Sequence, residues 1–346
     1  MSDRLLKVDS LLSSIFSFIG PCPALSRLSL TCKRWHEATK IILASRDVLV
    51  DFFSENLKYF DFVTQNWTSI DITDGFRSES PLAVLLAENV ITIIDTPDLI
   101  IRQFDPKKVG YRTISRHRNT YGSAHPPKLT HFSSAYSDGC IYIAGGRREE
   151  DDIASSSVWR FTIADSEWLQ MQALPMPLVS SVSAIIRNEN RKLSLTVVGS
   201  TVDLPTVVSV GFSIELDSLY HGHWLNTAIP PSEVMRFNSR CVVISDHRLI
   251  VGMWTSSTNR CQFSLIEFDS FENRWCERHP DPPASYIFPA LCQGNVVALA
   301  VDHSSRLLSM QYNEQLRQWQ VVRHPAEISH SFSLIIGAPK CSIQRS

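Results

Sequence analysis

Residues 131–146 read HFSSAYSDGCIYIAGG, and they are followed by SSVWRFTIAD at 156–165 and EWLQMQALP at 167–175. The first segment holds two β-rich runs joined at Ser137-Asp138-Gly139. Asp-Gly is a favoured pair at tight hairpin turns because both residues tolerate a positive φ. The second segment predicts a third strand, and the third predicts a short fourth strand that starts at Trp168. This stretch therefore predicts a four-stranded antiparallel unit.

The same order of strands recurs along the chain, and a spacing of seven residues between two aromatic side chains marks each copy. One further copy keeps Trp224 but has Asp217 seven residues earlier. The second aromatics, at positions 67, 111, 168, 224, 275 and 319, are 44 to 57 residues apart. Four strands per copy at this period are typical of propeller blades. The five complete pairs are Phe60 and Trp67, Phe104 and Tyr111, Phe161 and Trp168, Phe268 and Trp275, and Tyr312 and Trp319.

The first copy is incomplete, because residues 57–67 supply only its last two strands. The segment SHSFSLIIGAPK at 329–340 is expected to supply the two missing strands from the other end of the sequence. Such closure removes the exposed edges that an open array of sheets would carry. We therefore predict a mostly-β protein with a six-bladed β-propeller over residues 57–340, whose aromatic side chains pack between blades.

The pair Gly145-Gly146, together with the aromatic pairs and the tryptophan positions, resembles kelch repeats. Only one copy keeps the Gly-Gly pair, so the resemblance is strongest between residues 131 and 175. It implies a kelch-like propeller that binds another molecule on one of its faces.

The N-terminal segment at 8–35 reads VDSLLSSIFSFIGPCPALSRLSLTCKRW and has a different pattern. Asp9 is a helix-capping residue type, and apolar residues follow it at helical spacing until Gly20-Pro21 interrupts them. Two further short helices are expected, the last ending near Lys40. So small a unit cannot bury all of its apolar side chains, which indicates a partner surface.

This segment closely resembles the F-box, with paired aliphatic residues, an Ile-Phe pair, a proline break and a leucine-rich helix that runs into Cys32-Lys33-Arg34-Trp35. Val8-Asp9 stands where the family usually has Leu-Pro. The resemblance implies that the segment binds a Skp-type adaptor, which links it to a cullin. The residues that it assigns to adaptor binding are Leu11, Leu12, Ile15, Phe16, Ile19, Leu25, Leu28 and Trp35.

The resulting domain organisation is an F-box-like helical domain at 5–44, a linker at 45–56 and the propeller at 57–340. Within the linker, ASRDVLVDFF could either continue a helix or form an extra strand. Two other interpretations of the N-terminal segment are a helical hairpin packed on the main domain and a secretory signal. Asp9 and the absence of a small-residue cleavage site argue against the secretory signal.

Composition narrows the possible functions. A net charge of -2 over 346 residues indicates no attraction to nucleic acid or to an anionic membrane. No apolar run has the length that a bilayer requires. The eight cysteines are scattered without a Cys-x-x-Cys pair, which suits a reducing compartment, so we expect the protein in the cytoplasm, the nucleus or both.

No catalytic motif is recognisable, and no metal or other cofactor is expected. The charged run RREEDD at 147–152 follows the Gly-Gly strand, in a loop of the type that binds ligands in propellers. It could be a solvated loop, or it could read a charged peptide. The substrate-binding candidates are Arg147, Arg148, Arg236, Trp254, Tyr286 and His330, of residue types common at binding hot spots or in the same loops.

An F-box followed by a propeller resembles the substrate receptors of Skp–cullin–F-box ubiquitin ligases. The resemblance implies a non-catalytic subunit whose propeller holds the protein to be ubiquitinated. A propeller scaffold that takes no part in a ligase is the alternative. A propeller enzyme of the sialidase or oxidase type would need clustered acids with an arginine set, or copper ligands, and the sequence shows neither pattern.

Overall fold

The computed structural model of the 346-residue protein describes its residues in a series of stretches between positions 47 and 339. In several of the strands it describes the backbone alone. The predicted helices of residues 5–44 lie outside the described residues. The described stretches are 47–52, 56–61, 66–71, 83–87, 90–105, 110–115, 125–201, 208–230, 240–257, 260–279, 286–292, 295–301, 307–313, 316, 318–323 and 334–339.

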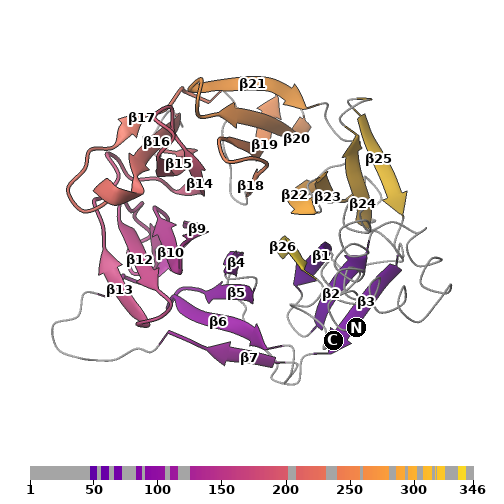
Figure 1. Ribbon diagram of the computed structural model, residues 1–346, viewed down its shortest axis with the longest axis horizontal. Helices are drawn as coiled ribbons and strands as arrows, with labels where there is room; N and C mark the ends of the chain where they lie inside the picture. The colour runs from indigo at the N-terminus through magenta and orange to yellow at the C-terminus, as the bar shows by residue number, and fades with distance from the viewer. Residues whose placement is uncertain are drawn as a thin grey trace, which may run out of the picture.

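Strands dominate the described residues, and six four-stranded antiparallel sheets form from them (Figure 1). Five of the sheets are propeller blades built from one continuous stretch of sequence each. In order, these contain β4 (Ala83–Ala87), β5 (Val90–Asp95), β6 (Ile100–Asp105) and β7 (Gly110–Thr113); β9 (Ser133–Ser137), β10 (Cys140–Ala144), β12 (Val158–Thr162) and β13 (Glu167–Gln170); β14 (Ser180–Arg187), β15 (Leu193–Ser200), β16 (Ser209–Glu215) and β17 (Leu225–Asn226); β18 (Arg240–Val243), β19 (Arg248–Ser257), β20 (Arg260–Asp269) and β21 (Arg274–His279); and β22 (Tyr286–Cys292), β23 (Asn295–Val301), β24 (Leu307–Asn313) and β25 (Gln318–Arg323).

The remaining four-stranded sheet combines strands from both ends of the described sequence. Its order is β26 (Leu334–Pro339), β1 (Asp47–Phe52), β2 (Asn56–Asp61) and β3 (Asn66–Asp71). The innermost strands β4, β9, β14, β18, β22 and β26 each contact the next, and β26 contacts β4 again. These contacts close a ring, which Figure 1 shows around a central opening. The predicted propeller arrangement is thus confirmed.

The closing sheet differs in detail from the prediction. We expected two strands from each end of the sequence, but β26 alone comes from the C-terminal end and three strands come from the N-terminal side. Strand β1 lies inside the segment 45–56 that we predicted to be a linker, and it pairs with both β2 and β26. The apolar run at 47–52 is too short to distinguish helix from strand by its pattern, so its sheet partners decide its structure.

The seven-residue aromatic spacing has a simple structural basis. Each complete pair lies directly opposite across the third and fourth strands of a sheet. Where both rings are described, their centroids are 5.1 to 5.5 Å apart and the rings are tilted or edge-on. Such pairs are worth about 0.5–1.5 kcal/mol beyond the area that they bury. The spacing therefore places one aromatic contact at the same point of each sheet.

Tryptophans of the fourth strands also connect neighbouring blades. Trp224 Nε1 donates to the carbonyl oxygen of Gln172 at 3.2 Å, and Trp275 Nε1 donates to that of Ala228 at 3.0 Å. Each acceptor follows the fourth strand of the preceding blade. Trp168, Trp224, Trp275 and Trp319 pack against apolar clusters that span two blades, as predicted.

The hairpin turn at Asp138-Gly139 confirms the prediction from this dipeptide. Asp138 has φ 48° and Gly139 has φ 73°, the positive values that the turn requires. Strand β10 follows it with four successive buried residues, because blades on both sides cover the two faces of the strand. None of the helices among the described residues has the length and apolar character needed to span a bilayer.

Candidate functional site

The Gly145-Gly146 pair anchors the loops on one end of the β9–β13 blade. Both glycines have positive φ, 67° and 95°. Gly145 N–H donates to Ser157 O at 3.0 Å, Gly146 N–H donates to Leu178 O at 2.8 Å, and Ser155 N–H donates to Gly146 O at 2.8 Å. A Cβ on Gly146 would lie 2.6 Å from the carbonyl oxygen of Thr130. The pair therefore allows three loop segments to pack more closely than they could around a residue with a side chain.

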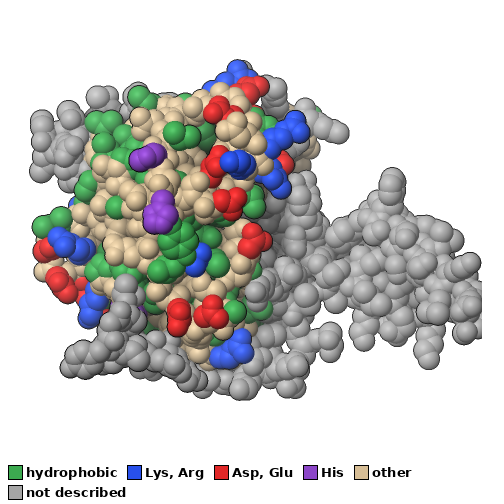
Figure 2. Space-filling model, turned by 60° about the vertical axis from the view of Figure 1, so that its left-hand side comes forward, with side chains coloured by type: hydrophobic (Ala, Val, Ile, Leu, Met, Phe, Trp, Pro, Cys, Tyr) green, Lys and Arg blue, Asp and Glu red, His purple; other side chains and the backbone are tan. Residues whose placement is uncertain are grey.

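Beyond the glycines, β11 (Arg147–Arg148) pairs with β8 (Leu129–Thr130) in a two-stranded sheet. The arginines of β11 form ion pairs with acids of their own loop. Arg147 Nη1 lies 2.6 Å from Asp152 Oδ2, and Arg148 Nη2 lies 2.7 Å from Asp151 Oδ2. Figure 2 shows basic and acidic side chains side by side at several places on the face in view. The two arginines of the charged run are thus paired with acids of the same run.

Two basic groups tie this loop to its surroundings. Lys128 Nζ lies 3.2 Å from Asp98 Oδ1 and 3.6 Å from Glu149 Oε2, so it bridges the preceding blade and the charged loop. The hydrogen bond to Asp98 is the main cause that raises the pKa of Lys128. Burial, and then the nearby Arg147 charge, lowers the pKa of His131.

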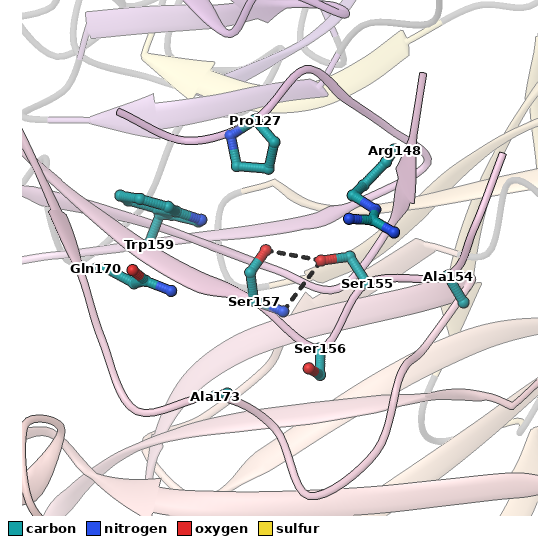
Figure 3. A pocket seen from close by; sticks show the side chains of 9 residues that line it. All are labelled: Pro127, Arg148, Ala154, Ser155, Ser156, Ser157, Trp159, Gln170 and Ala173. Atoms are coloured by element: carbon teal, nitrogen blue, oxygen red, sulfur yellow. Dashed lines mark hydrogen bonds between the residues drawn. The ribbon is translucent and has the colours of Figure 1, made fainter. Parts of the chain in front are cut away.

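A cavity of about 360 Å³ lies between these loops (Figure 3). Its polar lining comes mainly from the loop before β12 and from the adjoining ends of β12 and β13, while prolyl and alanyl side chains add apolar wall. The lining residues are Pro127, Arg148, Ala154, Ser155, Ser156, Ser157, Trp159, Gln170 and Ala173.

The serine segment of the pocket is held rigidly. Ser155 Oγ and Ser157 Oγ are 2.7 Å apart, and Ser155 Oγ also accepts from Ser157 N–H at 3.1 Å. Leu174 N–H donates to Ser156 O at 2.8 Å, and Leu178 N–H donates to Ser155 O at 3.1 Å. The backbone of the pocket wall is therefore preorganised in the absence of a ligand.

The structure brings together only part of the predicted substrate site. Of the predicted residues, Arg148 lines the cavity and Arg147 precedes it in β11. Trp254 lies in β19 opposite Phe263, and Tyr286 begins β22 opposite Val301, each in a different sheet from Arg148. Arg236 and His330 lie outside the described residues. The adaptor-binding candidates of residues 11–35 also lie outside them.

Sequence reasoning missed Trp159, Gln170 and the three serines at 155–157. The run of small polar residues just before a strand that begins with Val158-Trp159 is a weak sequence signal for such a pocket. The pocket itself depends on backbone hydrogen bonds to residues 174 and 178, which the local pattern does not show.

Two further features of the described residues bear on chemistry, namely their candidate metal ligands and their thiols. Among the described residues, no group of three or more His, Cys, Asp or Glu side chains is placed to hold a metal ion. Cys140, Cys241 and Cys276 form no disulfide, and burial raises the pKa of Cys276, which disfavours its reactive thiolate form. Burial likewise raises the pKa of Tyr142 to about 12.

Comparison with known proteins gives two family matches. Residues 9–46 match the F-box-like family, and residues 128–175 match the kelch motif. The kelch match begins just before β8 and ends after β13, so it covers the blade that carries the Gly-Gly pair and the pocket. A search of curated proteins found no matching relative. The protein therefore contains one segment similar to the F-box and one segment similar to the kelch motif.

Proposed function

We propose that this protein is the substrate-recognition subunit of a Skp–cullin–F-box ubiquitin ligase. The observation that carries the proposal is the F-box-like match at 9–46 directly before a closed propeller with a kelch motif. The F-box-like segment binds a Skp-type adaptor, and the adaptor links the protein to a cullin. The propeller binds the protein to be ubiquitinated.

In this role the protein performs no bond chemistry of its own. It raises the local concentration of a target beside an active site carried by another subunit, which is catalysis by proximity. A closed ring of sheets suits that task because it presents a surface to the target while the F-box-like segment binds the adaptor. The free cysteines of the described part suit a reducing compartment, and we propose that the protein acts in the cytoplasm or the nucleus.

Direct binding of the purified full-length protein to a purified Skp-type adaptor tests the proposal. A Phe16→Ala/Leu28→Ala variant truncates two large apolar side chains of the F-box-like segment. We expect it to weaken adaptor binding about tenfold or more, since buried apolar anchors carry most of the energy of such interfaces. Isothermal titration calorimetry gives the dissociation constants.

The matched control is Leu169→Ala/Leu225→Ala, which truncates two exposed leucines on the fourth strands of the propeller. It should bind the adaptor like the wild type. If the wild type shows no affinity for the adaptor, or if both double variants bind equally well, the ligase assignment fails. The protein is then best described as a propeller scaffold outside any ligase.

A further inference from the structure

The pocket beside the Gly-Gly loop contains hydrogen-bond donors without protein partners. Trp159 is 4% exposed, and its Nε1–H has no hydrogen-bond partner in the structure. Indole nitrogen can only donate, and an enclosed donor without an acceptor carries a free-energy penalty. An occupant that offers an acceptor at this point would recover that energy.

Arg148 supplies the second donor group from across the pocket. Its Nη2 pairs with Asp151 at 2.7 Å, and the side chain is 44% exposed, so the other N–H groups of the guanidinium are accessible to a ligand. Figure 3 shows the indole nitrogen of Trp159 and the guanidinium of Arg148 directed into the space above the serine segment. Like Trp159, arginine has no acceptor atom. The two fixed polar groups therefore select a ligand atom that accepts hydrogen bonds.

Size and charge narrow the class of ligand. A cavity of about 360 Å³ is near the lower end of the range for ligand pockets, so it suits one side chain or one polypeptide end. Pro127, Ala154 and Ala173 provide apolar contact for an aliphatic stem. Planar carboxylates match the fork of an arginine. The four acids at 149–152 outnumber the two arginines before them, which disfavours a doubly charged phosphate.

We propose that this pocket binds a carboxylate of the target protein, either an Asp or Glu side chain or the target's own C-terminus. Arg148 and Trp159 Nε1–H donate to its oxygens, and the apolar wall packs on its stem. The proposal deepens the proposed function, on which it rests, because it states what the propeller reads in a target. It also places the binding site on the outer half of one blade, since Trp159 and Gln170 lie on the third and fourth strands of that blade.

The test uses the full-length protein and degenerate peptide libraries with one fixed position. Three libraries are amidated at the C-terminus, and their fixed residue is Glu, Gln or phosphoserine. Two further libraries are fully degenerate, and they differ only in having a free or an amidated C-terminus. Fluorescence polarisation measures the binding of each. We expect about tenfold tighter binding of the Glu library over the Gln library, or of the free C-terminus over its amidated twin. Which pair shows the difference identifies the source of the carboxylate.

Two variants locate the site, and a third is the matched control. Arg148→Gln and Trp159→Phe should each reduce the preference for carboxylate several-fold, and Trp159→Phe keeps most of the ring volume. Arg274→Gln removes an exposed arginine that pairs with the neighbouring Glu272 in another sheet, and it should leave the preference unchanged. Thermal unfolding and adaptor binding of all three variants establish that they are folded.

The outcomes separate this proposal from the ligase assignment. Equal binding of carboxylate and amide peptides, tighter binding of phosphoserine peptides than of Glu peptides, or wild-type preference in Arg148→Gln each overturns the carboxylate pocket. Adaptor binding that persists in any of these cases leaves the proposed ligase function intact. If the wild type does not bind the adaptor, the ligase assignment is overturned, whatever the result of the peptide experiment.

Discussion

At the scale of single residues, Gly146 shows why one dipeptide matters so much to this blade. Its φ of 95° is unfavourable for any residue with a Cβ, and a Cβ there would press against the carbonyl oxygen of Thr130. Its amide and carbonyl bind Leu178 and Ser155, so a shift at Gly146 moves two pocket loops together. The glycine is therefore required by geometry on both counts.

We expect Gly146→Ala to lower the free energy of unfolding by about 2 kcal/mol or more, because it adds backbone strain to a close contact. Urea unfolding followed by tryptophan fluorescence measures the change. Gly139→Asn is the control, since asparagine tolerates the φ of 73° in the Asp138-Gly139 turn. If the two substitutions cost the same, close packing at Gly146 is not what makes it necessary.

We expect His131 to make the stability of the protein depend on pH. It lies two residues before β9, with Arg147 and Asp152 among the charges that act on it, and burial lowers its pKa. The unfolded protein therefore binds a proton at His131 more readily than the folded protein does. Stability from this residue is full above the unfolded pKa of about 6.5 and is lost as the pH falls below it.

We expect His131→Asn to flatten this part of the pH profile, and asparagine also accepts the φ of 54° at this position. Urea midpoints measured at pH 7.5 and 5.5 give the comparison. The wild type should lose more stability than the variant over this interval. Identical losses in the two proteins would show that His131 stays accessible to protons when the protein is folded.

At the scale of the secondary-structure elements, tryptophans of equal position differ in one hydrogen bond. Trp168 and Trp275 each face a phenylalanine at 5.1 Å, but only Trp275 donates to the preceding blade. Trp168 Nε1 is buried without a hydrogen-bond partner. A comparison of the two residues therefore distinguishes the contribution of the ring contact from that of the hydrogen bond between blades.

We expect Trp275→Phe to cost about 1 kcal/mol more than Trp168→Phe, because it also removes the hydrogen bond to the Ala228 carbonyl, whereas Trp168 Nε1 has no such bond to lose. The same urea unfolding assay, with absorbance or circular dichroism as the signal, measures both. An equal or larger cost for Trp168→Phe would contradict a stabilising role for the Trp275 bond.

Element patterns explain how much the sequence could predict. Turn chemistry at Asp138-Gly139 and the seven-residue aromatic spacing depend on neighbours in the sequence, so the blades could be predicted from them. Strand β1 could not, since its sheet forms through β26 from almost 290 positions further along. Of the residues that line the pocket, the sequence indicated only Arg148, which follows the Gly-Gly pair, whereas Trp159 and the serines depend on loops that meet only in the folded protein.

At the scale of the whole molecule, the inner strands of the sheets contact one another in a closed circle. β26 completes this circle, and its pairing with β1 leaves no inner strand without neighbours on both sides among the described sheets. The F-box-like match ends at residue 46, and β1 begins at residue 47. The F-box-like match therefore leads without a spacer into the sheet that closes the ring.

This organisation predicts that substitutions in the full-length protein can abolish adaptor binding without affecting target binding, and the reverse. Affinity purification of the tagged protein from cells, with quantification of co-purified Skp-type adaptor and cullin, is the most direct test. We predict that the wild type and Arg148→Gln recover both subunits, whereas Phe16→Ala/Leu28→Ala recovers neither. Absence of adaptor and cullin from the wild-type sample, or equal recovery with the double variant, would contradict the account.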